Sequence, residues 1–137
     1  MIAQLLIGMT VIFVIVNLYY FFSNRSYRHT WISSALFFKL TLILISLTFS
    51  FAAIYYLMSL EQVVLRINDP TGEPVEGTFM EYLYYSGVTL LSIGYGDMVP
   101  VGPARFISVV QAGLGVLLPA AYFLKAFGNT SSKESKT

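Results

Sequence analysis

The residues best suited to chemistry form one short segment, Ser92-Ile93-Gly94-Tyr95-Gly96-Asp97. The segment offers a hydroxyl, a carboxylate and two glycines, which adopt positive φ without a clash at Cβ. Signatures of other chemistries do not occur in the sequence: HExxH, GxSxG and paired carboxylates within an apolar run are all missing. A phosphate-binding loop does not fit either, because neither a lysine nor a suitably placed helix N-terminus follows Gly96. We therefore expect no enzymatic activity.

The composition indicates a membrane protein. Of the 137 residues, 56% are hydrophobic and 11% are charged, whereas a soluble domain is about 45–50% apolar and about a quarter charged. Eight Lys and Arg residues against seven Asp and Glu residues leave no polycationic surface, so we expect no nucleic-acid partner. The chain has no cysteine and a single histidine, His29, which excludes thiolate and multi-histidine metal sites.

Three apolar runs are long enough to cross a bilayer. Ile2 to Phe22 carries no formal charge, and at ~1.5 Å per residue it reaches about 31 Å, against a hydrocarbon core of ~30 Å. A second run extends from Trp31 to Leu60 with Lys39 as its only charge, and a last run extends from Pro103 to Phe127. We expect three transmembrane helices. The first is expected to be retained rather than cleaved as a signal peptide, because it lacks a basic start and a small-residue cleavage site.

A shorter apolar segment, Thr78 to Ser92, lies between the second and last runs. Its expected helix, residues 79–91, is only ~20 Å long, about half of a membrane. Thr78 and Glu81 have the spacing of a capping box at the start of this helix. Non-helical backbone at membrane depth is tolerated only where it is buried in protein or lines a watery cavity. A glycine-rich return after a half-length helix therefore predicts a re-entrant segment beside a cavity or pore.

The charges predict the side of the membrane on which each connection lies. Six of the eight basic residues fall between the first two runs, near the start of the second run or near the C-terminus: Arg25, Arg28, Lys39, Lys125, Lys133 and Lys136. Six of the seven acidic residues fall between the second and last runs: Glu61, Asp69, Glu73, Glu76, Glu81 and Asp97. Because cytoplasmic loops carry an excess of basic residues, we expect the N-terminus outside and the C-terminus in the cytoplasm. That assignment requires residues 78–97 to enter and leave the membrane on the same side.

The segment from Thr89 to Asp97, Thr-Leu-Leu-Ser-Ile-Gly-Tyr-Gly-Asp, resembles the pore signature of potassium channels. In that signature a hydroxyl residue, an aliphatic residue and Gly-Tyr-Gly precede an aspartate. The resemblance covers residues 40–127 and is to the small pore-only potassium channels, with one additional helix in front. It implies an all-α membrane protein with three transmembrane helices, a re-entrant pore helix and an extended selectivity filter, assembled as a homotetramer in the lipid bilayer of the plasma membrane.

The apolar runs, together with this resemblance, divide the chain into three parts. Residues 1–30 are expected to form the N-terminal transmembrane helix and a basic cytoplasmic loop. Residues 31–127 are expected to form the pore domain, with outer helix, pore helix, filter and inner helix in that order. Residues 128–137 are expected to be a short polar cytoplasmic tail.

The resemblance also implies a role for each residue of the filter. A potassium ion sheds its water only where other oxygens replace its hydration shell, which stacked rings of carbonyls do. The resemblance places potassium at the oxygens of Ser92, Ile93, Gly94 and Tyr95, followed by Gly96, and it implies no cofactor beyond the permeant ion. Asp97 is expected at the outer mouth, where an acidic ring concentrates cations.

Residues around the filter are predicted by the same comparison, with some departures from the family. Tyr84 and Tyr85 resemble the aromatic pair that packs around the filter tyrosine, although interfacial aromatics without filter contact are an alternative. Val88 occupies a position that some members fill with an acid. Ser92 replaces the usual threonine and Leu91 replaces a frequent hydroxyl residue, so a poorly selective cation channel is the nearest alternative function.

The last apolar run contains a set of residues with two possible roles. Gly113 resembles the hinge of the inner helix in the family, with Gly115 and Pro119 close by. Close packing of small residues against a neighbouring helix is an equally good interpretation. Gln111 is polar at membrane depth, and we expect it to form an interhelical hydrogen bond rather than to bind an ion.

Other functional classes are less consistent with the sequence. A helical scaffold or accessory subunit, with Gly94-Tyr95-Gly96 as an extracellular turn, leaves unexplained why that turn follows a capped half-length helix. No run carries arginine at every third position, so no voltage sensor of the usual kind is predicted. No regulatory partner is identifiable from the sequence.

Overall fold

The computed structural model describes residues 2–23 and 34–134. These residues form four helices and two short strands: α1 (Ile2–Ser23), α2 (Ser34–Ser59), β1 (Leu65–Ile67), α3 (Phe79–Leu90), β2 (Met98–Pro100) and α4 (Ala104–Glu134). Two helices contain stretches long and apolar enough to cross a membrane, Leu36–Ser59 in α2 and Ala104–Lys125 in α4.

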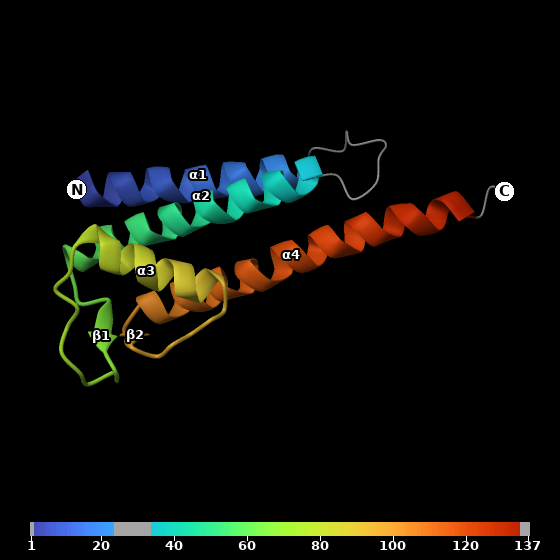
Figure 1. The fold of residues 1–137 in the computed structure, drawn as a ribbon. Helices are drawn as coiled ribbons and strands as arrows, with labels where there is room; N and C mark the ends of the chain where they lie inside the picture. The colour runs from blue at the N-terminus through green and yellow to red at the C-terminus, as the bar shows by residue number, and fades with distance from the viewer. Residues whose placement is uncertain (1, 24–33, 135–137) are drawn as a thin grey trace.

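The helices lie side by side, with α2 packed against α1 on one side and against α3 and α4 on the other (Figure 1). The N-terminus of α1 lies at the same end of the molecule as the two strands, and the C-terminal end of α4 lies at the opposite end. In α1, the side chains that the structure describes form the apolar stretch Gln4–Asn17. This stretch is shorter than a membrane span. A membrane crossing by α1 therefore stays a prediction, as does the orientation of the chain in the bilayer.

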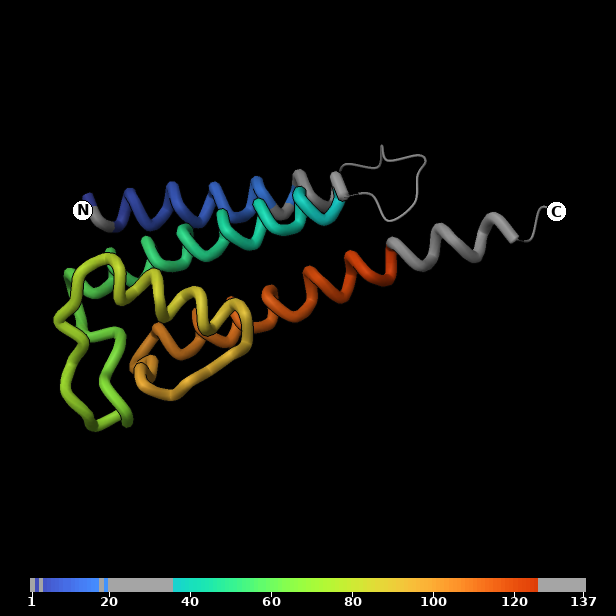
Figure 2. Tube along the Cα trace, viewed as in Figure 1, coloured from blue at the N-terminus to red at the C-terminus, as the bar shows by residue number. Residues whose placement is uncertain are grey.

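Helix α3 ends within the molecule, and the chain then turns back. It begins at the end that carries the strands, runs beside α2 and stops about half-way along it; the following segment returns to the start of α4 (Figure 2). The bounds Phe79–Leu90 agree with the helix expected over residues 79–91. This part of the chain thus enters and leaves at one end of the molecule, as the charge pattern requires.

The expectation of an all-α protein is incomplete, because the connections at this end form a small antiparallel sheet. Strand β1 pairs with β2 in the register Leu65 with Pro100, Arg66 with Val99 and Ile67 with Met98. The Val101 amide extends this contact by donating to the carbonyl of Val64 over 2.9 Å. The sheet ties the loop after α2 to the segment that follows Asp97.

Helix α4 is longer than expected. We predicted that it ends near residue 127, before a polar tail, but the helix continues to Glu134 and passes through Pro119 without a break. The basic loop expected after the first helix, residues 24–33, lies outside the described residues.

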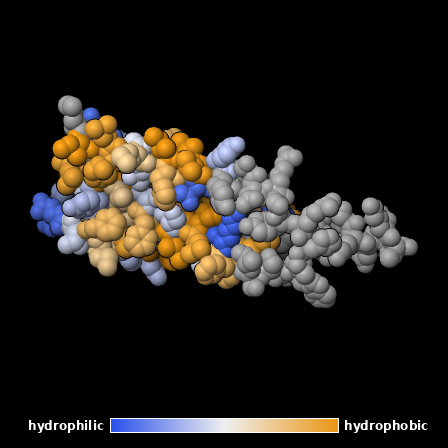
Figure 3. Space-filling view, turned by 90° about the horizontal axis from the view of Figure 1, so that it is seen from above, coloured by the Kyte–Doolittle hydropathy of each residue, from blue (hydrophilic) through white to orange (hydrophobic). Residues whose placement is uncertain are grey.

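Apolar side chains make up both the interior and much of the exterior. The core is built from buried side chains of α2, α3 and α4, among them Leu47, Leu90 and Leu118. Those of α2 come from its inner face. Large apolar side chains are also exposed along α1, α2 and α4, and Figure 3 shows apolar area spread over the face seen from above. So much exposed apolar surface is expected where lipid or another subunit covers the protein.

At Gly115 the backbones of α3 and α4 approach each other closely. A Cβ built at Gly115 would overlap the carbonyl group of Leu90, the last residue of α3. A Cβ at Gly113 would meet no atom within 4 Å. Of the two glycines, Gly115 therefore has a packing role within one chain.

This difference predicts opposite effects for two alanine substitutions. Gly115→Ala forces the end of α3 away from α4 and is expected to destabilise the protein by about 1–3 kcal/mol, the usual cost of overpacking. Gly113→Ala is the matched control and is expected to be neutral or to gain up to about 1 kcal/mol from helix propensity. Thermal unfolding of both purified variants in one detergent measures the difference. Equal stability of the two variants would contradict the close approach at Gly115.

Candidate functional site

The segment after α3 has a backbone that alternates in handedness. Ser92, Gly94 and Gly96 have positive φ, at 56°, 59° and 81°, whereas Ile93 and Tyr95 between them do not. Neither a helix nor a strand has this alternation, since both repeat a single region of negative φ. Residues 92–96 are thus neither a continuation of α3 nor part of β2.

Ser92 carries backbone strain. A residue with a side chain is uncommon at positive φ, and such residues cluster at functional sites where the surrounding structure holds them in place. A β-branched residue adopts this region less readily than serine does. The serine that stands where potassium channels usually have threonine is therefore compatible with the backbone of this chain.

The carbonyl end of α3 is tied to the start of this segment. The amide of Ile93 donates to the carbonyl of Val88 over 2.9 Å, and the amides of Leu91 and Ser92 donate to the carbonyls of Gly87 and Thr89 over 3.0 Å each. The carbonyls at the end of a helix have no intrahelical partner, and these hydrogen bonds give them one. The orientation of α3 therefore sets the direction in which the segment begins.

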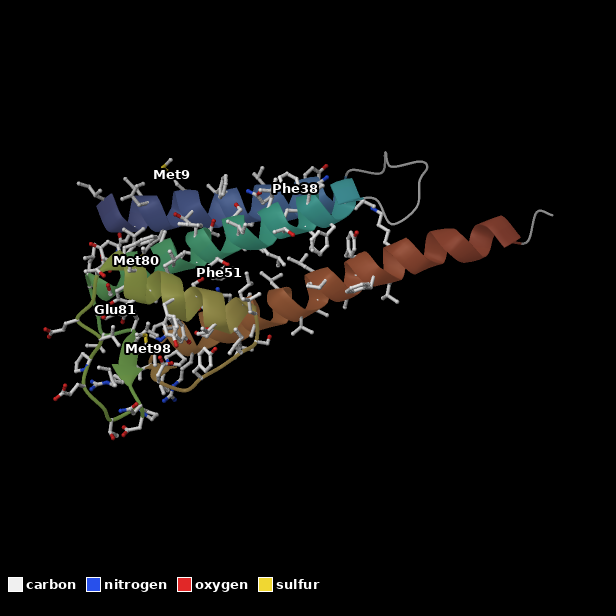
Figure 4. The ribbon with its side chains drawn as sticks, in the orientation of Figure 1. Met9, Phe38, Phe51, Met80, Glu81 and Met98 are labelled. Atoms are coloured by element: carbon white, nitrogen blue, oxygen red, sulfur yellow. The ribbon has the colours of Figure 1, made fainter. Side chains whose placement is uncertain are left out.

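Asp97, at the other end of the segment, is fixed by the chain around it. Its carbonyl accepts a hydrogen bond from the amide of Asn68 over 2.9 Å, and its Oδ1 accepts one from the amide of Met98 over 3.1 Å. The first of these bonds connects the segment to the loop that follows β1. Figure 4 shows Met98, the first residue of β2, in this region below α3.

The two predicted support tyrosines lie in different places. Tyr84 is partly exposed and interacts with the Asp97 carboxylate, with Tyr95 close by. Tyr85 is buried and points away from the segment: its hydroxyl lies 2.7 Å from Ser108 Oγ, and its ring packs edge-to-face on Tyr55. Within one chain, Tyr84 is thus the tyrosine that contacts the outer end of the segment.

Val88 lies on an open apolar groove. The groove has a volume of about 380 Å³ and is lined by side chains of α3 and of the segment after it: Met80, Leu83, Tyr84, Gly87, Val88, Leu91 and Ile93. No charged side chain faces Val88 there, so the support of the segment on this side is apolar.

Comparison with known proteins identifies the family to which this architecture belongs. Residues 43–130, more than half of the chain, match the family described as "Ion channel". The chain belongs to this ion-channel family. The match takes in α3, the alternating segment and most of α2 and α4, which are the parts of the channel described above.

Two relatives share parts of the channel sequence. Protein LctB of Geobacillus stearothermophilus is 58% identical over 38 residues, which is 28% of each chain. Protein LctB of Bacillus caldotenax is 32% identical over 78 residues, which is 56% of this chain and 58% of that protein. The channel thus aligns with less than two thirds of the length of these curated relatives. No solved structure matches the chain.

The start of α3 differs from the predicted capping box. Thr78 is the N-cap residue with extended backbone, but its side chain makes no capping hydrogen bond. Glu81 lies in the first turn, and its carboxylate folds back against Gly77, where an added Cβ would overlap it. The reciprocal pair of bonds is therefore not formed. The Glu81 charge still lies at the positive end of the α3 dipole, where it is stabilising.

A cluster of buried polar side chains joins the three inner helices of the channel. Its members carry hydroxyl or amide groups and are buried between α2, α3 and α4: Tyr55, Tyr85, Ser86, Ser108 and Gln111. Gln111 donates from Nε2 to the carbonyl of Ser86 over 2.9 Å and to Ser86 Oγ over 2.7 Å. It accepts from the Tyr55 hydroxyl over 2.8 Å. The interhelical hydrogen bond predicted for Gln111 is confirmed.

The rest of this buried polar cluster was not predicted. Ser108 Oγ lies 3.1 Å from the Tyr55 hydroxyl and 2.8 Å from the carbonyl of Ala104, and the Ser86 hydroxyl donates to the carbonyl of Thr48 over 2.8 Å. Serine and tyrosine are ordinary residues in membrane helices, so neither their number nor their spacing marked them out. The signal available for this cluster was that each of the three packed helices carries a polar residue.

The alternating segment yields a prediction with a matched control. Alanine at positive φ costs about 1–2 kcal/mol in each chain, so Gly96→Ala is expected to shift the segment out of its alternating conformation and abolish ion flux, with membrane insertion unchanged. Gly102→Ala changes a glycine that also has positive φ, 55°, but lies beyond β2, so its flux is expected to be retained. Ion flux from liposomes is measured for both variants. Normal flux through the Gly96→Ala protein would exclude a functional role for this backbone.

Proposed function

We propose that the protein is a potassium-selective channel that conducts potassium passively through a homotetrameric filter, Ser92-Ile93-Gly94-Tyr95-Gly96. The observation that carries the proposal is the alternation of φ along residues 92–96, directly after a helix that stops half-way through the molecule. Alternating left- and right-handed residues turn successive carbonyls toward the same side of the chain. In this arrangement the oxygens of residues 92–95 form the path of a dehydrated potassium ion.

The direction of α3 also supports a cation pathway. Its carbonyl end, which carries about half of a negative charge, lies at Leu90 and Leu91. No basic residue lies in the last turn of α3 to cancel this charge. In a tetramer, four such helix ends stabilise a cation midway through the membrane.

The homotetramer is supported by the surface that one chain leaves open. A single filter strand surrounds no ion, so a closed ring of carbonyls needs several copies, and four is the number in the potassium channels that the motif resembles. Leu91, Ile93 and Tyr95 are exposed, at 63%, 47% and 68%. Side chains of this size suit a contact with the neighbouring subunit, together with the groove along α3.

The proposed orientation follows the charges. The loop with β1 and its acidic residues faces outside in the plasma membrane, Asp97 lies at the outer mouth, and the C-terminus of α4 lies in the cytoplasm. The helix α1 crosses the membrane beside α2, at the periphery of the tetramer, because it packs along α2.

Ion flux in liposomes tests the proposal. With potassium inside and sodium outside, the purified protein is expected to give a reversal potential close to the potassium equilibrium value. Native mass spectrometry of the same sample is expected to show four chains.

Each alternative predicts a different result in the same experiment. A reversal potential near zero with clear flux would replace the proposal by a poorly selective cation channel. An assembled tetramer without flux at any pH, lipid composition or membrane tension would instead favour a scaffold or accessory subunit.

A further inference from the structure

The buried polar cluster lies directly behind the part of α3 from which the filter begins. Ser86 stands one helical turn before Leu90, the last residue of α3, and Ser92 opens the alternating segment two residues later. Gln111 reaches Ser86 from the N-terminal third of α4, and Gln111 is fully buried within a single chain, at 0% exposure. The hydrogen bonds between Gln111 and Ser86 therefore act on α3 close to its end and from its buried side.

The hydrogen-bonding capacity of the cluster fixes the orientation of the Gln111 side chain. Its amide nitrogen has two protons, and the carbonyl and hydroxyl oxygens of Ser86 accept one each. Its oxygen accepts the proton of the Tyr55 hydroxyl. A flipped amide would place its oxygen against the Ser86 carbonyl, so that two acceptors face each other. Gln111 is therefore held in a single orientation.

Tyr55, which orients Gln111, is itself fixed by two neighbours. Its ring packs edge-to-face on Tyr85 with centroids 5.2 Å apart, and its hydroxyl lies 3.1 Å from Ser108 Oγ. Because Tyr55 belongs to α2 and Ser108 to α4, the donor that sets the Gln111 amide is fixed by the same helices that enclose α3. The bonds form one connected set, so a change at one member is felt at the others.

Hydrogen bonds between helices fix the rotation and the depth of a short helix, which apolar packing alone leaves variable. In a bilayer, apolar side chains gain little by contacting each other instead of lipid, so an apolar interface restricts the rotation and depth of a short helix weakly. The Gln111 amide matches two oxygens of one residue on α3, which sets both the rotation and the depth of that helix. The direction in which the carbonyls of Val88 and Thr89 hold the filter follows from that placement.

We infer that Gln111 is a positioning residue for the filter, which acts from α4 through Ser86 to set the end of α3 and thereby the ion selectivity of the pore. The inference rests on the proposed function, because it assumes that residues 92–96 select the ion. It adds a determinant of selectivity that lies outside the filter and on a different helix.

The test compares relative permeability and thermal stability of variants of the protein reconstituted in liposomes. Gln111→Met keeps the size of the side chain and removes its hydrogen bonds, and the ratio of potassium to sodium permeability is expected to fall about tenfold, the effect of one net hydrogen bond on an equilibrium. Leu118→Met is the matched control, since Leu118 is buried on the same helix outside the cluster. It is expected to keep the wild-type ratio.

Two further variants show whether Gln111 acts through the cluster. Ser86→Ala removes one of the two oxygens that bind the Gln111 amide, and its effect on the permeability ratio is expected to be shared with Gln111→Met, so the double variant changes the ratio little more than Gln111→Met does. Tyr55→Phe removes the donor that orients the Gln111 amide and is expected to shift the ratio in the same direction. If Gln111→Met does not assemble, these two milder variants carry the test.

The outcomes separate this inference from the proposed function. The inference alone is overturned if the wild-type protein conducts selectively and all assembled cluster variants keep the wild-type permeability ratio, with only their melting temperatures lowered. The cluster would then have a purely structural role. Fully additive effects of Gln111→Met and Ser86→Ala would overturn the route through Ser86. A wild-type protein without selective flux would overturn the proposed function and the inference with it.

Discussion

The interaction on which the rest of this structure depends is the set of hydrogen bonds between Gln111, Ser86 and Tyr55. A helix that stops half-way through a membrane protein has no second membrane interface to fix its depth. Here α3 is fixed from inside, because Gln111 of α4 binds two oxygens of Ser86 while the Ser86 hydroxyl binds the Thr48 carbonyl of α2. Each polar group of this set has a partner, which matters because an unpaired polar group in an apolar interior costs several kcal/mol, about 2–7 depending on the reference state.

The segment after α3 depends on being held at both of its ends. At its inner end, Ile93 is bonded to the carbonyl of Val88, so the placement of α3 is passed on to the chain. At its outer end, Asp97 is bonded to Asn68, and the pairing of β1 with β2 follows directly. Ser92, next to the inner end, remains at a positive φ that a side chain disfavours, and its own amide is bonded to the carbonyl of Thr89. Bonds at both ends of the segment therefore hold this strained backbone within one chain.

The sequence predicted the parts of the molecule that depend on length, charge and glycine. The half-length helix over residues 79–91 and its return to the same end followed from apolar run lengths and from the distribution of acidic and basic residues. The ion-channel family followed from the resemblance of residues 89–97 to a known pore signature. The parts that depend on side-chain geometry did not follow. Thr78 and Glu81 have the spacing of a capping box, but the Glu81 carboxylate folds against Gly77 instead. Strands of three residues are too short to give an alternating pattern. The burial of Tyr85 toward α2 rather than toward the segment after α3 depends on the rotation of α3, which no sequence pattern specifies.

We propose that four copies of residues 92–96 surround a row of potassium ions. An experimental structure of the protein prepared in a thallium salt tests this arrangement most directly, because thallium(I) has nearly the size of potassium and scatters anomalously. We expect a row of anomalous peaks on a fourfold axis, level with the carbonyl oxygens of Ser92, Ile93, Gly94 and Tyr95. Chains arranged without such an axis, or an axis with no peak beside these oxygens, would contradict it.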